Sequence, residues 1–206
     1  GQYPQQGKQK SGLGFPLARL VALISLQCGA VLDWAMGPCK GKGTGEDGLF
    51  RELYRSLSSG DIVLGDRYHC SYFTVAALQL IGADMVTRQH ARRVTDFRRG
   101  ERLGKRDHRV TWKRPARPEW MDEQTYAQIP EELTVREAKV GQWILVSTLC
   151  DATQVSKLEL NALYVQRWNI ELDLRTLKST LQLEQLTCTS PEMVAKEIHA
   201  AMITYN

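Results

Sequence analysis

The stretch "DIVLGDRYHCSYFTVAALQLIGADMVTRQ", residues 61–89, decides the fold of this chain of 206 residues. Residues 61–66 form an apolar run of strand length that ends in a carboxylate, residues 71–82 repeat apolar side chains at helical spacing, and residues 83–89 form a second strand-like run. A strand, a helix and a strand in this order predict two parallel strands joined by a crossover helix. We therefore expect an α/β fold.

The segments before residue 61 predict a hairpin and a helix. Residues 17–26 and 29–38 are two short runs rich in Val, Leu and Ile with a tight turn between them, so we expect two adjacent strands. Residues 46–57 carry apolar side chains at helical spacing and indicate an amphipathic helix. Residues 1–16 are rich in Gly, Gln and Pro and are interpreted as a loop, an unusual start for a domain. Together with a helix still running at the other end, this suggests that the chain is the middle of a larger protein.

The segments after residue 89 predict a β-rich stretch followed by helices. Residues 88–118 are expected to be extended or irregular, with "RVTWK" as a possible strand, because Pro115, Pro118 and Pro130 exclude long helices. "ELTVREAKV" and "QWILVSTL" are expected to be two further strands. One long helix is expected over 156–185, and another begins at Pro191. We divide the chain into 1–89, the first part of an α/β core, 90–150, a mainly β basic insertion, and 151–206, the C-terminal helices of the core.

Positive charge is concentrated in one block. The formal net charge is +4, yet Arg88 to Pro118 holds twelve Lys/Arg against three acids, a net charge of +9. A block of this kind, dominated by Arg, favours a polyanion such as a nucleic acid, because the guanidinium fork can grip two phosphate oxygens. The alternative is a solvated basic loop without a partner.

Composition excludes several classes of protein. The five cysteines are scattered, odd in number and without a C-x-x-C pair, which argues against a disulfide framework and a zinc site. No run approaches the roughly 18 apolar residues of a membrane span, and no signal peptide opens the chain. We expect a cytoplasmic protein without a membrane partner.

A stripe of polar side chains marks the last long helix. Tyr164, Arg167, Glu171 and Lys178 fall within an arc of roughly 60° when each residue advances by about 100°. The stripe lies beside a leucine edge, so it can line a cleft. The alternative is a solvent-facing row in which Arg167 and Glu171 form a weak i, i+4 pair.

A second acid, Asp66, stands at the carboxyl end of the first strand of the opening stretch, where open α/β sheets hold their sites. In isolation it could equally be a turn former. The spacing Y-x-x-R-x-x-x-E-x-x-x-x-x-x-K of the stripe resembles the signature of bacterial insertion-sequence transposases of the Asp-Asp-Glu (DDE) class, in the group similar to insertion sequence four. "GDIVLGDRYHCSYF" resembles the strand of that family that bears the second Asp, and residues 15–38 resemble its preceding hairpin, so the similarity covers nearly the whole chain.

This resemblance implies a ribonuclease-H-like fold, a mixed sheet flanked by helices, with a mainly β insertion before the last catalytic helix. Members of the family cut and rejoin double-stranded DNA at transposon ends with Mg²⁺ or Mn²⁺, ions that prefer carboxylate oxygens. Asp66 and Glu171 are then the second and third catalytic, metal-binding acids. The expected DNA contacts are Tyr164, Arg167, Lys178, Trp143, Arg98, Arg99, Arg106 and Arg109. For Trp143, a stacking role on an unpaired base competes with ordinary core packing.

The first Asp of the family lies on a strand before the hairpin, and no residue of this sequence stands in its place. We therefore expect two of the three acids and little or no strand transfer by this chain alone. The alternatives are a truncated, non-catalytic derivative that binds DNA or inhibits an intact transposase, and a nuclease of the same fold. A homodimer on DNA is expected because two transposon ends must be paired.

Overall fold

The computed structural model describes residues 3, 17–41, 43–170, 175, 179, 186–188 and 190–206. The chain divides into two compact units, one formed by Gly1–Ser56 with Gln166–Asn206 and the other by Leu57–Val165. The predicted division at residues 89 and 150 differs from these units and stays a prediction. Among the described residues, no helix is long and apolar enough to cross a membrane.

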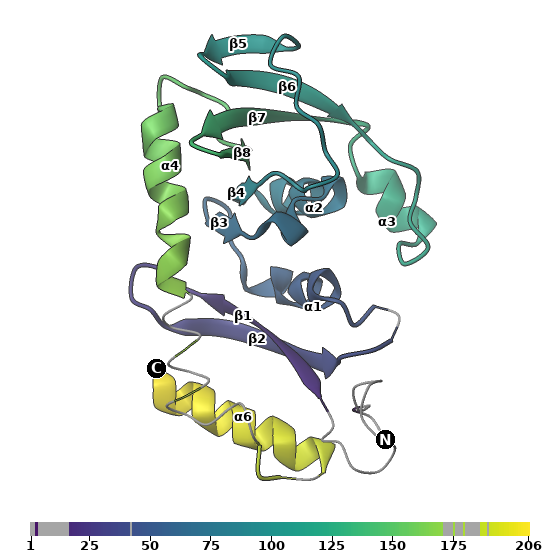
Figure 1. Cartoon of the computed structure of the whole chain (residues 1–206). Coiled ribbons are helices and arrows are strands. Elements are labelled where there is room, and N and C mark those ends of the chain that lie inside the picture. The colour runs from purple at the N-terminus through teal and green to yellow at the C-terminus, as the bar shows by residue number, and fades with distance from the viewer. Residues whose placement is uncertain are drawn as a thin grey trace. The chain divides into compact units, whose positions relative to one another are not determined.

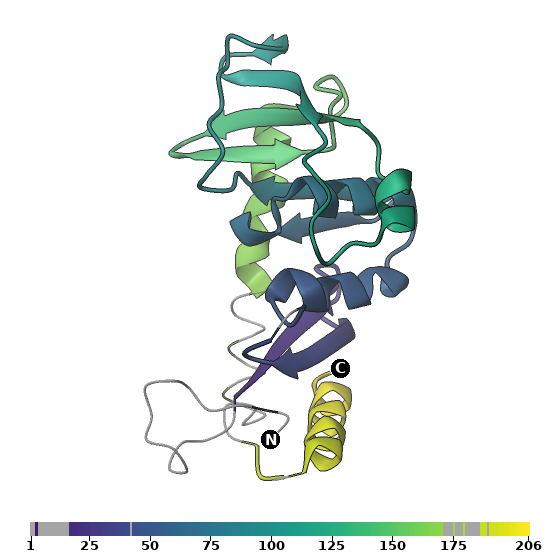
Figure 2. The same ribbon diagram turned by 90° about the vertical axis from the view of Figure 1, so that its right-hand side faces the viewer.

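The Leu57–Val165 unit is built on a six-stranded mixed sheet of strand order β3-β4-β8-β7-β6-β5 (Figure 1). Its strands are β3 (Ile62–Gly65), β4 (Asp84–Arg88), β5 (Glu101–Gly104), β6 (Asp107–Lys113), β7 (Glu132–Val140) and β8 (Trp143–Ser147). Helices α2 (Tyr72–Ile81) and α4 (Lys157–Val165) cover opposite faces of this sheet, as both views show (Figures 1 and 2). A mixed sheet flanked by helices confirms the predicted fold class and is consistent with a ribonuclease-H-like fold.

The opening stretch forms the predicted strand, helix and strand. β3 and β4 pair in parallel, with Val63 opposite Met85 and Gly65 opposite Thr87. Helix α2 begins after Ser71, whose hydroxyl accepts the N–H of Thr74, and ends at Gly82 in the left-handed conformation. The carboxyl ends of both strands therefore meet at one edge of the sheet.

The core under α4 shows why the sheet faces are apolar. Val86 of β4, Ala138 of β7 and Leu145 of β8 pack against Leu160 and Tyr164 of α4. β4 contacts both α2 and α4, and its central residues Met85, Val86 and Thr87 are all buried, so this strand does not alternate between buried and exposed residues.

Two short elements of the 90–131 segment were not predicted individually from the sequence. β5 carries little apolar pattern and forms because its backbone pairs with β6 at the edge of the sheet. Helix α3 (Glu123–Gln128) is short, too short for a hydrophobic period to reveal, and Asp122 caps it by accepting the N–H of Thr125. β5 therefore forms through strand pairing and α3 through its N-terminal cap, and neither gives a periodic apolar pattern in the sequence.

The other unit contains the predicted hairpin, β1 (Ala18–Ile24) and β2 (Val31–Pro38), paired antiparallel, followed by α1 (Glu46–Glu52) and the 3₁₀ turn η1 (Leu53–Ser56). Helix α6 (Pro191–Tyr205) packs on the hairpin through Val194, Ile198 and Met202. The side-chain amide of Asn206 pairs with the backbone N–H and C=O of Val31. These contacts give this unit its own small core.

The helix expected over 156–185 is interrupted. α4 ends at Val165, Gln166 lies in a turn, and residues 167–170 are helical again. At this point the N–H of Asn169 donates to the carbonyl of Gln166, a three-residue spacing that tightens the backbone. Most of residues 171–185 lie outside the described part of the chain.

Candidate active site

Asp66 follows β3 directly and stands at the carboxyl end of the parallel pair. Its backbone carbonyl accepts a hydrogen bond of 2.8 Å from the hydroxyl of Thr87, a fully buried residue of β4. Its side-chain Oδ1 accepts the backbone N–H of Arg67, which caps the short 3₁₀ turn η2 (Arg67–His69). Within the described residues, Oδ2 makes no hydrogen bond, and the side chain is exposed. The arrangement holds the backbone firmly and leaves a carboxylate oxygen facing outward.

The side chain of Met85 packs closely over the residue before Asp66. A Cβ placed on Gly65 would lie 2.8 Å from the terminal methyl carbon of Met85, so a larger residue would require that methyl group to shift.

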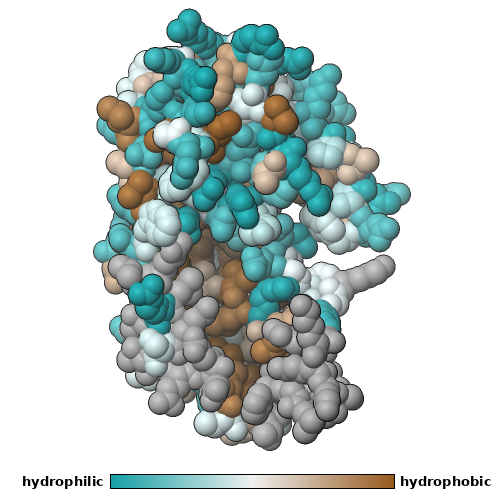
Figure 3. All heavy atoms as spheres, viewed as in Figure 1, coloured by the Kyte–Doolittle hydropathy of each residue, from teal (hydrophilic) through white to brown (hydrophobic). Residues whose placement is uncertain are grey.

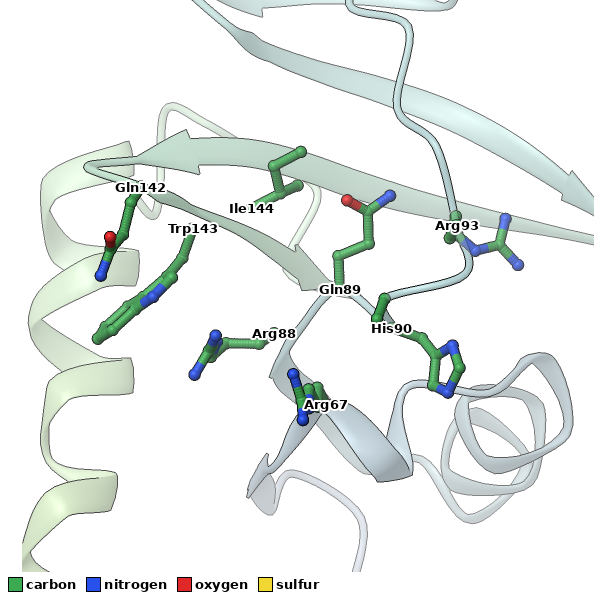
Figure 4. Close-up of a pocket in the computed structure, with 9 residues that line it drawn as sticks. Arg67, Arg88, Gln89, His90, Arg93, Gln142, Trp143 and Ile144 are labelled. Carbon is green, nitrogen blue, oxygen red and sulfur yellow. The ribbon is translucent and has the colours of Figure 1, made fainter.

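A pocket of about 250 Å³ opens on the same unit and is lined in part by Arg67, the residue that follows Asp66 in the chain (Figure 4). Its walls come from η2, from the end of β4 with the residues that follow it, and from the start of β8. The residues that line it are Arg67, Arg88, Gln89, His90, Ala91, Arg93, Gln142, Trp143 and Ile144. This lining includes three arginines and no acid, so the pocket suits an anion.

Trp143 forms one wall of the pocket and is only partly buried. The guanidinium of Arg88 lies 4.6 Å from the centre of its ring, and Figure 4 shows Arg88 between Trp143 and Arg67. A flat cation on an aromatic face is a favourable contact of modest strength. The ring therefore presents a face that polar, planar groups can reach.

Arg93 is held on the other side of the pocket. Its guanidinium lies 3.5 Å from the centre of the Trp112 ring. Burial lowers the pKa of Arg93, and the nearby Cys70 and Glu137 work in the opposite direction. Burial raises the pKa of the Cys70 thiol to about 11, so this thiol stays protonated near neutral pH and is not a nucleophile.

The four arginines predicted to contact DNA lie around the β5–β6 hairpin. Arg98 and Arg99 both pair with Asp96, whose pKa falls to about 2 because the Arg98 side chain and backbone donate to it. Arg109 pairs with Glu101 across the two strands. Exposed pairs of this kind contribute little stability, so phosphate oxygens can replace their carboxylates.

Arg106 differs from the other three. It occupies the turn between β5 and β6 with φ of 52°, the left-handed region that a non-glycine residue rarely adopts. Its carbonyl accepts the N–H of Lys139 at 2.8 Å, which holds the turn against β7. Figure 3 shows mainly hydrophilic residues over this end of the sheet.

The helical stripe is only partly open to description. Tyr164 is 1% exposed and lies in the core under α4, so its side chain supports the sheet in this structure. Arg167 is partly buried, with its guanidinium 5.4 Å from the ring centre of Trp168. Glu171 and Lys178 lie outside the described residues. The roles predicted for the four stripe residues stay predictions.

Several pocket residues escaped the sequence analysis. Arg67 was not singled out, and Arg88 and Arg93 were counted only as part of the basic block. The rule that placed Asp66 could have found Arg88 as well, because both residues stand at the carboxyl ends of the parallel strands. Nothing in the local sequence distinguishes Gln142. Among the described residues, no group of three or more His, Cys, Asp or Glu side chains forms a metal cluster.

Comparison with known proteins assigns the chain to a family. The family model described as "Transposase DDE domain" matches residues 2–206. The chain is 28% identical over 211 residues to the transposase InsG for insertion sequence element IS4 of Escherichia coli strain K12, across 99% of this chain and 46% of the relative. The chain thus spans about half the length of the curated relative that it matches.

Proposed function

Because the chain belongs to the transposase DDE domain family, we propose that it forms part of the catalytic region of an insertion-sequence transposase that cuts and joins DNA with divalent metal ions. The family expected from the sequence is confirmed. The observation that carries the rest of the proposal is an exposed carboxylate, Asp66, whose neighbour in the chain, Arg67, is one of three arginines that line a pocket.

Asp66 fits the role of a metal ligand by its chemistry. Mg²⁺ and Mn²⁺ prefer hard oxygen ligands, and Asp66 offers a solvent-facing carboxylate on a backbone held by Thr87. Glu171 is the proposed second acid, on the strength of its place in the sequence motif. When bound, such ions activate the attacking water or 3′-hydroxyl and neutralise charge on the leaving oxygen. A third acid of the family has no proposed counterpart in this sequence, and we propose that the chain alone performs little strand transfer.

The cationic pocket suits the phosphates of a DNA strand. Arg67, Arg88 and Arg93 carry positive charge without a lining acid to neutralise it, so phosphate oxygens are the matching ligand. Trp143 offers a stacking surface for an unpaired base, and Arg88 now covers that surface. We propose that a nucleotide enters with its base on Trp143 while Arg88 turns to a phosphate.

The remaining contacts lie farther along the DNA. Arg98, Arg99, Arg106 and Arg109 are proposed to bind phosphates beyond the pocket, and Tyr164, Arg167 and Lys178 to hold the strand near Glu171. A homodimer that pairs two transposon ends is part of the same proposal. All of these contacts position the DNA and none of them reads its sequence.

The metal part of the proposal is tested by Mn²⁺ binding to the chain, measured by titration calorimetry and by the electron paramagnetic resonance signal of free Mn²⁺. Asp66→Asn and Glu171→Gln should each weaken binding by about tenfold or more, since each removes one anionic ligand. Asp61→Asn is the matched control, because Asp61 stands just before the opposite end of the same strand and is exposed. If all three variants bind Mn²⁺ as tightly as the native chain, neither Asp66 nor Glu171 is a ligand of the ion.

The DNA part is tested separately. Binding of labelled duplex should weaken steeply with salt for the native chain, and Arg88→Ala should weaken it while leaving Mn²⁺ affinity unchanged. A chain that binds DNA but not Mn²⁺ would favour the alternative, a non-catalytic derivative that occupies transposon ends. A chain whose DNA binding is independent of salt and of Arg88 would contradict the proposed interface.

A further inference from the structure

Glu137 of β7 is a buried carboxylate in the Leu57–Val165 unit, and only 5% of its side chain is exposed. Thr95 donates its hydroxyl hydrogen to Oε2 at 2.6 Å, and the indole of Trp112 donates to Oε1 at 2.9 Å. Nε2 of His108 lies 3.2 Å from Oε2. A carboxylate is costly to bury unless several donors surround it, and here β6 and the segment after β4 supply them.

The first of these bonds sets the orientation of a pocket residue. The hydroxyl of Thr95 has one hydrogen, and Glu137 takes it, so Thr95 must act as an acceptor toward its other neighbour. That neighbour is Gln89, whose Nε2 donates to Thr95 at 2.6 Å. The amide of Gln89 is therefore held with its nitrogen toward Thr95, which turns its oxygen away from Thr95.

The second bond fixes a wall of the same pocket. The indole of Trp112 is held by Glu137 through its N–H, and its face carries the guanidinium of Arg93. Arg93 and Gln89 both line the pocket, as Figure 4 shows. One carboxylate therefore holds two of the polar groups that a pocket ligand would meet.

The third contact extends to the basic segment that follows. Nδ1 of His108 donates to the carbonyl of Arg99 at 2.6 Å, and the ring of Phe97 lies 4.9 Å from that of His108. The stretch from Gln89 to Arg99 is thus attached near its start, middle and end to side chains that converge on Glu137. We call residues 89–99 the basic loop.

We propose that Glu137 is a positioning residue for the pocket: it presets Gln89 and Arg93, and with them the basic loop, for an unpaired nucleotide of DNA. The proposal rests on the proposed function, in which that nucleotide enters the pocket. Preset groups lose little freedom on binding, so the energy of their contacts appears as affinity. Glu137 itself touches no ligand, because it is buried behind Thr95 and Trp112.

The test compares two probes, a short duplex whose end carries one unpaired 2-aminopurine nucleotide and the same duplex fully paired. Thr95→Val keeps the shape of the side chain and removes only the link between Gln89 and Glu137. It should weaken binding of the unpaired-ended probe by about tenfold, because the two hydrogen bonds through the Thr95 hydroxyl that orient Gln89 are lost, and change the paired probe by less than about twofold. Thr95→Ser restores the hydroxyl and should restore the preference.

Glu137→Gln should also weaken binding of the unpaired-ended probe. The amide nitrogen that replaces one carboxylate oxygen is a donor, so it cannot accept the hydrogen of Thr95 or Trp112. Glu132→Gln is the matched control on the same strand, exposed and outside the network, and should behave like the native chain. If Glu137→Gln fails to fold, Thr95→Val carries the test, since it leaves the bonds from Trp112 and His108 intact.

Four outcomes separate the proposed nucleotide site from the inference about Glu137. A native chain without preference for the unpaired-ended probe overturns the proposed nucleotide site and this inference with it. A native preference that survives Thr95→Val unchanged overturns the inference alone. Equal loss of both probes also overturns it, because a general structural defect lowers both affinities together. Loss of the preference in Thr95→Val with recovery in Thr95→Ser supports it.

Discussion

Removal of the charge on Asp107 should destabilise the chain more than the substitution of any exposed charged residue. Asp107 of β6 and Arg136 of β7 form a two-pronged ion pair, with Nε to Oδ1 at 2.8 Å and Nη2 to Oδ2 at 2.6 Å. Arg136 is 0% exposed and Asp107 4%. Arg136 also donates from Nη1 to the carbonyl of Val155, just before α4. The change we consider is Asp107→Asn.

The expected magnitude follows from this burial. Asn keeps the volume of Asp but leaves the guanidinium of Arg136 buried without a counter-charge, and breaking such a pair costs about 3–5 kcal/mol in unfolding free energy. Replacing both partners by apolar residues, as in Asp107→Leu with Arg136→Met, removes the buried charge altogether. That double variant loses the bond to Val155, worth about 1 kcal/mol, yet should be more stable than Asp107→Asn by about 2 kcal/mol or more.

Urea unfolding provides the measurement. Three of the five tryptophans, Trp112, Trp120 and Trp143, lie within the unit concerned, so tryptophan fluorescence follows its unfolding. The denaturant slope should stay unchanged while the midpoint falls for Asp107→Asn. Glu101→Gln, which breaks the exposed pair with Arg109, is the control and should move the midpoint little. A loss below about 1 kcal/mol for Asp107→Asn, or a double variant less stable than the single one, would refute the reasoning.

Three further predictions concern charge, acid and the proposed metal site. Asp96→Asn frees its two arginine partners, so duplex affinity should rise and the slope of log affinity against log salt should steepen by about 1–2, as measured by anisotropy. Glu197 has a pKa lowered to about 2 because the backbone N–H groups of Thr187 and Cys188 donate to it. The stability that this carboxylate contributes is therefore complete above its unfolded pKa of about 4.3 and is lost as the pH falls toward 2. Hydrogen exchange of the Thr187 and Cys188 amides should speed up over that pH range in the native chain and not in Glu197→Gln. Thr87→Val removes the donor to the Asp66 carbonyl and should weaken Mn²⁺ binding by about threefold to tenfold in calorimetry, whereas an unchanged affinity would show that strand pairing alone positions Asp66.

The sequence alone determined several of the local elements and the position of one proposed site residue, Asp66. The apolar runs of residues 61–89 predicted the strand β3, the helix α2 and the strand β4, with the two strands parallel, because strand and helix periods are local properties of a chain. "ELTVREAKV" became β7 over the predicted residues. Asp66 was placed at a strand end by the same reasoning, since the carboxyl ends of parallel strands lie together in any such fold.

Only the tertiary structure decided which polar side chains meet. Glu137 looks like an ordinary strand acid in the sequence, and its contacts reach Thr95 and His108, 42 and 29 residues away. β5 exists because β6 pairs with it, and Tyr164, predicted to line a cleft, is buried because the sheet lies beneath α4. Local periodicity carries no information about such pairs. They arise from how the sheet brings distant segments together and from the need to satisfy each polar group that burial removes from water.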